Sequence, residues 1–153
     1  MKTILLPLNI DANTMALFEY AQPIAAEMDA SLLLLHVVRK QSYDNGTFAP
    51  DTDVHQRMVQ EARMILEQLA RKAITHGIRA RVLVLDGHPS KAILDTAKKT
   101  KADMILLSRV CGKPDCTTEQ VMDAATCPVL TMRNEPHDTS PQGRVESLAL
   151  AEA

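Results

Sequence analysis

The chain has 153 residues, of which 46% are hydrophobic and 24% are charged, and its formal net charge is −2. This length suits one domain with a buried core. Proteins that bind nucleic acid usually carry a basic face, and this balance gives no sign of one. The longest apolar run, residues 32–38, is far too short to cross a membrane. We therefore expect neither nucleic acid nor a membrane as a partner.

Cysteine usage indicates the compartment. Three cysteines, an odd number in a chain of this size, do not make a disulfide framework, which favours a cytoplasmic protein. Cys111 and Cys116 do not form a metal site by themselves, because structural zinc needs about four ligands and the chain has no second cysteine pair. We expect no metal, and we expect Cys127 to be a small buried residue.

Short aliphatic runs and helical patterns alternate along the chain. The runs are apolar at nearly every position, which is typical of parallel strands covered by helices on both faces. They lie at residues 3–8, 31–38, 80–85, 104–108 and 128–132. Apolar residues with helical spacing lie between them, at residues 17–28, 54–73, 89–101 and 117–125. This alternation predicts right-handed crossovers and a doubly wound α/β fold.

Local signals mark the ends and the interior of these helices. Gly77 stands where a helix that ends at His76 needs a left-handed residue. Thr117 and Gln120 have the spacing of a capping box at the start of the last helix. Pro23, inside the first helix, is expected to kink or break it. Five methionines are expected to pack in the core: Met58, Met64, Met104, Met122 and Met132.

Ligands of doubly wound sheets bind beyond the carboxyl ends of the strands, where the strand order reverses. In this chain, Asn9 and Asp11 follow the first strand, and residues 108–116 follow the fourth. Asn9 and Asp11 could contact a ligand there; the alternative is that Asp11 or Asn13 caps the first helix. Arg109 and Lys113 could hold an anion by charge, or they could be solvated surface side chains.

Several segments resemble the universal stress protein family in their sequence and in their order. They are residues 2–8 and 33–38, the Gly87-His88-Pro89 start of a helix, residues 102–108, and the closing strand from Cys127-Pro128 to Met132. The resemblance covers roughly residues 2–133. It implies a five-stranded parallel sheet in the order 3-2-1-4-5, with an adenine nucleotide alpha hydrolase-like fold. It also implies one domain over residues 1–133, and the polar residues 134–153 are expected to be a mobile tail.

ATP-binding members of that family have an aspartate after the first strand and a glycine-rich loop after the fourth, which ends in Gly-Ser or Gly-Thr. Here the aspartate position is Asn9 and the first glycine position is Ser108. The second glycine falls at Cys111 or Gly112, and the last pair falls near Asp115-Cys116. The loop is shorter by about six residues, so its amides cannot form the usual phosphate cradle. The resemblance therefore implies a divergent member of the non-ATP-binding kind, with no cofactor.

We expect a non-enzymatic stress-response or regulatory protein that acts as a homodimer through an unidentified protein partner. The alternative is a small-molecule binding module that still takes an adenine nucleotide or another anion between the first and fourth strands. A weaker hypothesis is an enzyme, either a nucleotide hydrolase or a thiol-redox protein that uses Cys111 and Cys116. No catalytic residue is assigned. If a ligand binds, the residues expected at it are Asn9, Asp11, Val38, Ser108, Arg109, Gly112, Lys113 and Thr117.

The last strand lies at an edge of the expected sheet, with one row of backbone groups unpaired. Family members often pair this strand with its twin across a two-fold axis. The resemblance therefore implies a dimer through Val129, Leu130, Thr131 and Met132, with the N–H of Leu130 at the centre of the ladder. The alternative is that the tail folds back over this edge. Four side chains are expected to be buried in the core: Leu6, Leu34, Val82 and Leu106.

Overall fold

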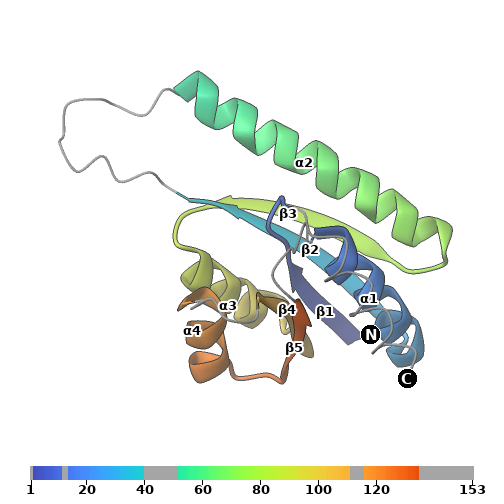
Figure 1. Ribbon diagram of the computed structural model, residues 1–153. Helices are drawn as coiled ribbons and strands as arrows, with labels where there is room; N and C mark the ends of the chain where they lie inside the picture. Colours follow the sequence, from blue (N-terminus) through green and yellow to red (C-terminus); the bar gives the residue numbers. More distant parts are fainter. Residues whose placement is uncertain (1, 12–13, 40–51, 111–115, 135–153) are drawn as a thin grey trace, which may run out of the picture.

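The computed structural model describes residues 2–11, 14–39, 52–110 and 116–134, in which a parallel sheet is flanked by helices (Figure 1). Its strands are β1 (Lys2–Pro7), β2 (Ala30–Val38), β3 (Ala80–Asp86), β4 (Met104–Val110) and β5 (Val129–Asn134). Its helices are α1 (Thr14–Met28), α2 (Thr52–Thr75), α3 (Pro89–Thr100) and α4 (Cys116–Ala124). Each strand pairs in parallel with its neighbour, in the order β3-β2-β1-β4-β5. The predicted fold class, strand direction and strand order are confirmed.

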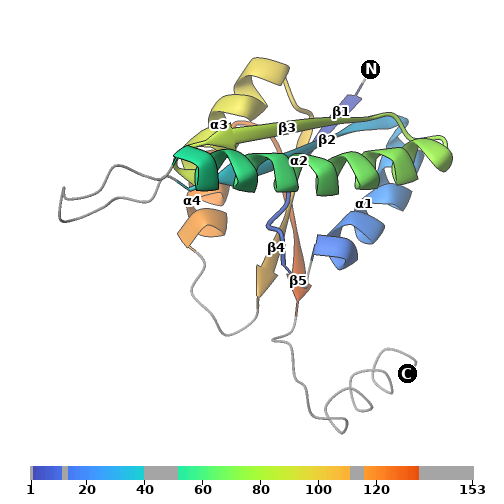
Figure 2. The same ribbon diagram turned by 90° about the horizontal axis from the view of Figure 1, so that it is seen from above.

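The sheet separates two hydrophobic clusters. Successive side chains of a strand point to opposite faces. Leu34 of β2 therefore packs on one face with Phe18 of α1 and Leu66 of α2. Leu33 packs on the other face with Ile93 of α3. The two views show α1 and α2 on one side of the sheet, and α3 and α4 on the other (Figures 1 and 2). Burial on both faces explains why the strands are apolar at nearly every position.

The predicted core residues are buried with one exception. Leu6, Leu34 and Leu106 have no exposed surface. Val82 packs against the same cluster but is only half-buried, so the expectation of full burial was wrong for this residue. Its strand, β3, has a neighbour on one side only, and an edge strand is covered less completely than a central one.

The methionines divide between the core and the surface. Met104 and Met132 pack partly buried against the core, whereas Met58, Met64 and Met122 are exposed, so their assignment to the core was wrong. Met64 is 62% exposed although it lies two residues from the buried Ala62 and Leu66. Two residues advance an α-helix by about 200°, so its side chain points away from the sheet.

The helix signals had mixed outcomes. Gly77 has φ 80°, in the left-handed region predicted for it. Pro23 lies inside α1, which continues unbroken to Met28. Proline has no N–H to donate to the carbonyl oxygen of the preceding turn. Because Pro23 is exposed, water can bond to that carbonyl oxygen instead. The capping box was wrong, because α4 begins at Cys116 and Thr117 therefore lies within the helix.

Candidate functional site

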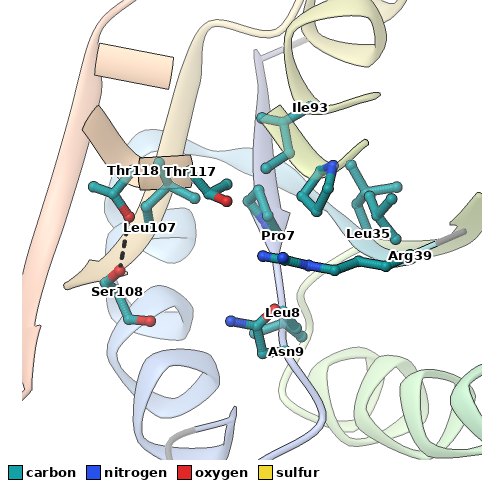
Figure 3. Close-up of a pocket in the computed structure, with 12 residues that line it drawn as sticks. Pro7, Leu8, Asn9, Leu35, Arg39, Ile93, Leu107, Ser108, Thr117 and Thr118 are labelled. Carbon is teal, nitrogen blue, oxygen red and sulfur yellow. Dashed lines mark hydrogen bonds between the residues drawn. The ribbon is translucent and has the colours of Figure 1, made fainter. Parts of the chain in front are cut away.

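The carboxyl ends of β1, β2 and β4 surround a small cavity of ≈ 90 Å³, into which the first turns of α3 and α4 also project (Figure 3). It lies between β1 and β4, the position predicted for a ligand in this fold. The lining residues are Pro7, Leu8, Asn9, Leu35, Val37, Arg39, Pro89, Ile93, Leu107, Ser108, Thr117 and Thr118. Three of the residues predicted at a ligand are thus brought together here: Asn9, Ser108 and Thr117.

The turn after β1 is fixed by a threonine that sequence reasoning missed. The hydroxyl of Thr14, the first residue of α1, donates a hydrogen bond to the carbonyl oxygen of Asn9. The same oxygen atom of Thr14 accepts from the N–H of Asp11 at 3.0 Å. The N–H of Thr14 in turn donates to the carbonyl oxygen of Asp11 at 3.3 Å. These bonds hold Asn9 at the cavity, and a threonine at a helix start was the signal for them.

The other wall of the cavity is fixed by α4. Thr118 is 2% exposed, and its hydroxyl donates to the carbonyl oxygen of Ser108 at 3.3 Å (Figure 3). This bond positions the end of β4 against the first turn of α4. Thr117, the preceding residue, also lines the cavity. Two adjacent threonines therefore divide their roles: Thr118 holds the strand, and Thr117 is available to a ligand.

Arg39 is the cation among the described lining residues of the cavity, and sequence reasoning did not single it out. It follows β2 directly, and its exposed side chain extends across the cavity toward β1 (Figure 3). Among the described lining residues, no aspartate or glutamate opposes this charge. The first turns of α3 and α4 add the partial positive charge of two helix N-termini. The site therefore favours an anionic or electron-rich group.

A hydrogen-bonded chain joins the starts of α3 and α4 beside this cavity. Ser90 is 6% exposed and donates from its hydroxyl to Oε1 of Gln120 at 2.6 Å. Its oxygen atom also lies 2.9 Å from Nδ1 of His88, which must then be the donor, because a serine hydroxyl carries one proton. Gln120 thus bonds to another helix instead of closing a capping box within its own.

The remaining predicted residues lie elsewhere. Val38 is buried, and the neighbouring Val37 lines the cavity instead. Asp11 is in the turn after β1 but does not line the cavity. Arg109 lies outside the cavity, with its Nη2 atom 3.9 Å from Oε1 of Glu119. Gly112, Lys113 and Cys111 lie outside the described residues, and Cys116 is the first residue of α4.

Within the described residues, no three side chains of His, Cys, Asp or Glu lie close enough together to hold a metal ion. His36 on β2 is half-buried, and its Nδ1 lies 2.8 Å from the carbonyl oxygen of Leu8. This contact links the end of β2 to the residue that follows β1, so the role of His36 is structural. Within the ranges that the structure describes, no helix is long and apolar enough to cross a membrane.

The parallel sheet and the cavity where its strand order reverses define a doubly wound α/β protein. Comparison with protein families identifies it further. The model of the universal stress protein family matches residues 1–133. The chain therefore belongs to the universal stress protein family, a family of stress-response proteins.

Individual relatives agree with this assignment. Universal stress protein YxiE of Bacillus subtilis is 27% identical over 124 residues, which are 72% of this chain and 84% of that protein. The solved structure of universal stress protein UspA from Lactobacillus plantarum has a TM-score of 0.74 and 25% identity, covering 86% of this chain and 97% of the other. The structure of a universal stress protein from Archaeoglobus fulgidus in complex with dAMP has a TM-score of 0.65 and 16% identity. The match covers 86% of this chain and 97% of the other.

Proposed function

We propose that this chain is a non-enzymatic, cytoplasmic stress-response protein that acts as a homodimer and does not bind ATP in the usual way. The observation that carries the proposal is the size of the cavity between β1 and β4. Its volume is ≈ 90 Å³, whereas pockets that enclose drug-sized ligands have volumes of roughly 300–1,000 Å³. A nucleoside triphosphate is at least as large as such ligands, so the space that the described residues enclose is too small for it.

The chemistry of the cavity walls supports the same conclusion. A triphosphate needs several backbone amides that approach it closely, and glycines permit that approach. In this chain, Ser108 stands at the end of β4, and Gly112 is the only glycine between it and Cys127. Asn9 can offer an amide to a base, but it carries no carboxylate. Among the described residues, the wall therefore offers no glycine amide and no carboxylate for a nucleoside triphosphate.

The charge of the same site favours a second function, binding of a smaller anion or of an adenine nucleotide with fewer phosphates. Arg39 reaches into the cavity, and Thr117 adds a hydroxyl beside the start of α4. The Archaeoglobus fulgidus relative was solved with dAMP. A monophosphate would need one cation and one helix N-terminus, and this site offers both.

Titration calorimetry distinguishes the two functions. With ATP and magnesium we expect no saturable binding, and a dissociation constant of about 10 μM or tighter, near −7 kcal/mol, would contradict the main proposal. The same titration with dAMP tests the second function. Binding that Arg39→Ala abolishes and Arg109→Ala preserves would establish it, because only the first of these arginines lines the cavity. Asn9→Asp, which restores the missing carboxylate, should not restore ATP binding while the cavity stays small.

A further inference from the structure

A second surface of the molecule lies at the outer edge of β3, the strand next to the β2 residues that line the cavity. Within the described residues this strand pairs with β2 and with no other strand. α2 covers one face of it, whereas α3 packs over β1 and β2. The face of β3 on the α3 side is therefore only partly covered, and a groove of ≈ 590 Å³ runs between the strand and the helix.

The backbone of β3 has a defined free side. The N–H of Leu32 donates to the carbonyl oxygen of Arg79, and the N–H of Gly87 donates to that of Val38. In a parallel ladder, these two bonds direct the odd-numbered residues of β3 toward β2. The N–H and C=O groups of the even-numbered residues, among them Val82 and Val84, therefore point outward. They form a row of donors and acceptors to which another strand can add.

The groove beside this edge has an apolar floor and a rim of mixed charge. Leu83 and Leu85 of β3 are half-buried and, with Ala92 and Thr96 of α3, form the floor. Lys91 and Lys99 of α3 line it together with Asp86 and Asp95, so the excess of cations comes from the neighbouring end of the strand.

The amino end of the same strand adds two more cations. Arg79 and Arg81 line a neighbouring hollow of ≈ 470 Å³, together with Thr3, Ser31 and the exposed Ile74. By alternation along the strand, Arg81 lies on the same face as Leu83.

The charge of the whole surface is positive. Four cations, Arg79, Arg81, Lys91 and Lys99, form no ion pair within the described part of the chain. Two acidic residues, Asp86 and Asp95, also line the groove. Oδ1 of Asp86 lies 2.9 Å from Nε2 of His55. The unpaired strand edge, the apolar floor and this excess of cations are complementary to one kind of occupant.

We propose that the edge of β3 binds an acidic, extended segment of another protein, which adds to the sheet as a sixth strand. The segment's backbone pairs with the outward groups of Val82 and Val84. Its alternate side chains lie over the groove: apolar ones against Leu83 and Leu85, and acidic ones near Arg79 and Arg81. Backbone pairing supplies affinity in such complexes, and the side-chain positions supply specificity.

This proposal concerns a different edge of the sheet from the dimer and a different site from the cavity, so it stands or falls separately from the proposed function. A second copy of the same chain fits the β3 edge less well, because two copies would bring the unpaired cations of both surfaces together. A segment with carboxylates would instead neutralise them.

Fluorescence anisotropy with a synthetic probe tests the proposal. The probe is a labelled peptide with the sequence Glu-Thr-Glu-Thr-Ile-Thr-Ile-Thr, tested with its reversed sequence so that parallel and antiparallel addition are both sampled. We expect saturable binding of one of the two, weakened by added salt. Val82→Pro removes an outward N–H that bonds to nothing within the sheet, and it should weaken binding about tenfold or more. Val82→Thr keeps this N–H and a β-branched side chain, so its binding should match that of the unaltered protein.

Two further comparisons keep the test valid if Val82→Pro does not fold. Methylating the backbone nitrogens of the probe should abolish binding to the unaltered protein, because it blocks the same ladder from the other side. Arg81→Glu should weaken binding about tenfold, whereas Arg63→Glu, on the exposed face of α2, should not change it. The proposal is overturned if neither probe binds saturably. It is also overturned if the Arg81→Glu protein binds the probe as tightly as the unaltered protein does and the unaltered protein binds the methylated probe as tightly as the unmethylated one. It is also overturned if the protein alone is a dimer that Val82→Pro converts into a monomer.

Discussion

Hydroxyl side chains position the loops around the cavity between β1 and β4. Thr14 fixes the turn after β1, Thr118 fixes the end of β4, and Ser90 joins α3 to α4. All three are buried, with exposed fractions of 7% or less. A buried hydroxyl without a partner would be costly, so these bonds specify the geometry of the loops as well as stabilising it. The polar side chains that line the cavity beside them are those of Asn9, Arg39, Ser108 and Thr117.

At the same scale, Cys127 is a thiol with a perturbed environment. Partial burial raises the pKa of its thiol above the ordinary value, and the negative charge of Asp103 raises it further. At neutral pH the thiolate fraction is therefore small, and the thiolate is the reactive form. We expect iodoacetamide to alkylate Cys127 more slowly than a free cysteine, with a rate that rises toward alkaline pH. The rate is measured by mass spectrometry on the Cys111→Ser, Cys116→Ser protein.

Asp103→Asn provides the matched comparison. It removes the negative charge and keeps an oxygen atom that can accept the 2.8 Å hydrogen bond from the N–H of Thr3. The pKa of Cys127 should fall, and alkylation at pH 8 should become faster. An unchanged rate would show that burial alone sets the reactivity of this thiol.

At the scale of elements, β2 carries the centre of the core. It pairs with β1 on one side and β3 on the other, and Leu34 in its middle has no exposed surface. Leu34→Ala should lower the free energy of unfolding by about 2–5 kcal/mol, because it removes buried apolar atoms and leaves a cavity. Chemical denaturation is followed by circular dichroism, since the chain has no tryptophan, at one fixed protein concentration.

The control for this prediction is Met64→Ala on α2. Met64 is 62% exposed, and the change should alter the free energy of unfolding by no more than about 0.5 kcal/mol. A loss below about 1 kcal/mol for Leu34→Ala would contradict the central place of β2.

The sequence predicted the strands well because their apolar runs pack against helices, and the central strands β1 and β2 are buried on both faces. Its predictions were weaker where an element ends or meets another. β4 extends through Arg109 to Val110, beyond the apolar run that predicted it, because backbone pairing with β5 continues there. Full burial was wrongly predicted for Val82, since sequence does not show how far helices cover an edge strand. Gln120 was misread because its partner, Ser90, is distant in the chain.

The candidate site was predictable where topology alone decides it. Asn9 and Ser108 follow β1 and β4, and the carboxyl ends of adjacent parallel strands meet at one edge of the sheet. Arg39 was missed because its role depends on the direction of one long side chain. Thr14 and Thr118 were missed because they act through backbone oxygens of other segments.

At the scale of the whole molecule, the two sheet edges offer different surfaces. The β3 edge lies beside unpaired cations. The β5 edge presents Leu130, which is 36% exposed, and the half-buried Thr131. The first four residues of β5 carry no charge, and Arg133 lies near its end, so this edge is suited to pairing with its own copy. The register of β5 also corrects one expectation. The N–H of Ile105 donates to the carbonyl oxygen of Pro128, so the N–H of Leu130 is directed at β4 and is not available to a partner.

The outward donor at the centre of β5 is the N–H of Thr131, and this residue gives the sharper test of the proposed dimer. We expect the unaltered protein to have twice the monomer mass of 16.8 kDa in light scattering at micromolar concentration. Thr131→Pro should give the monomer mass, because it removes a backbone donor from the shared ladder and leaves the bonds to β4 intact. Thr131→Val, which keeps the backbone N–H, should remain a dimer. A monomer mass for the unaltered protein would reject the dimer and favour the alternative in which residues 134–153 cover this edge. If Thr131→Pro remained a dimer, the two copies would have to meet through a surface other than β5.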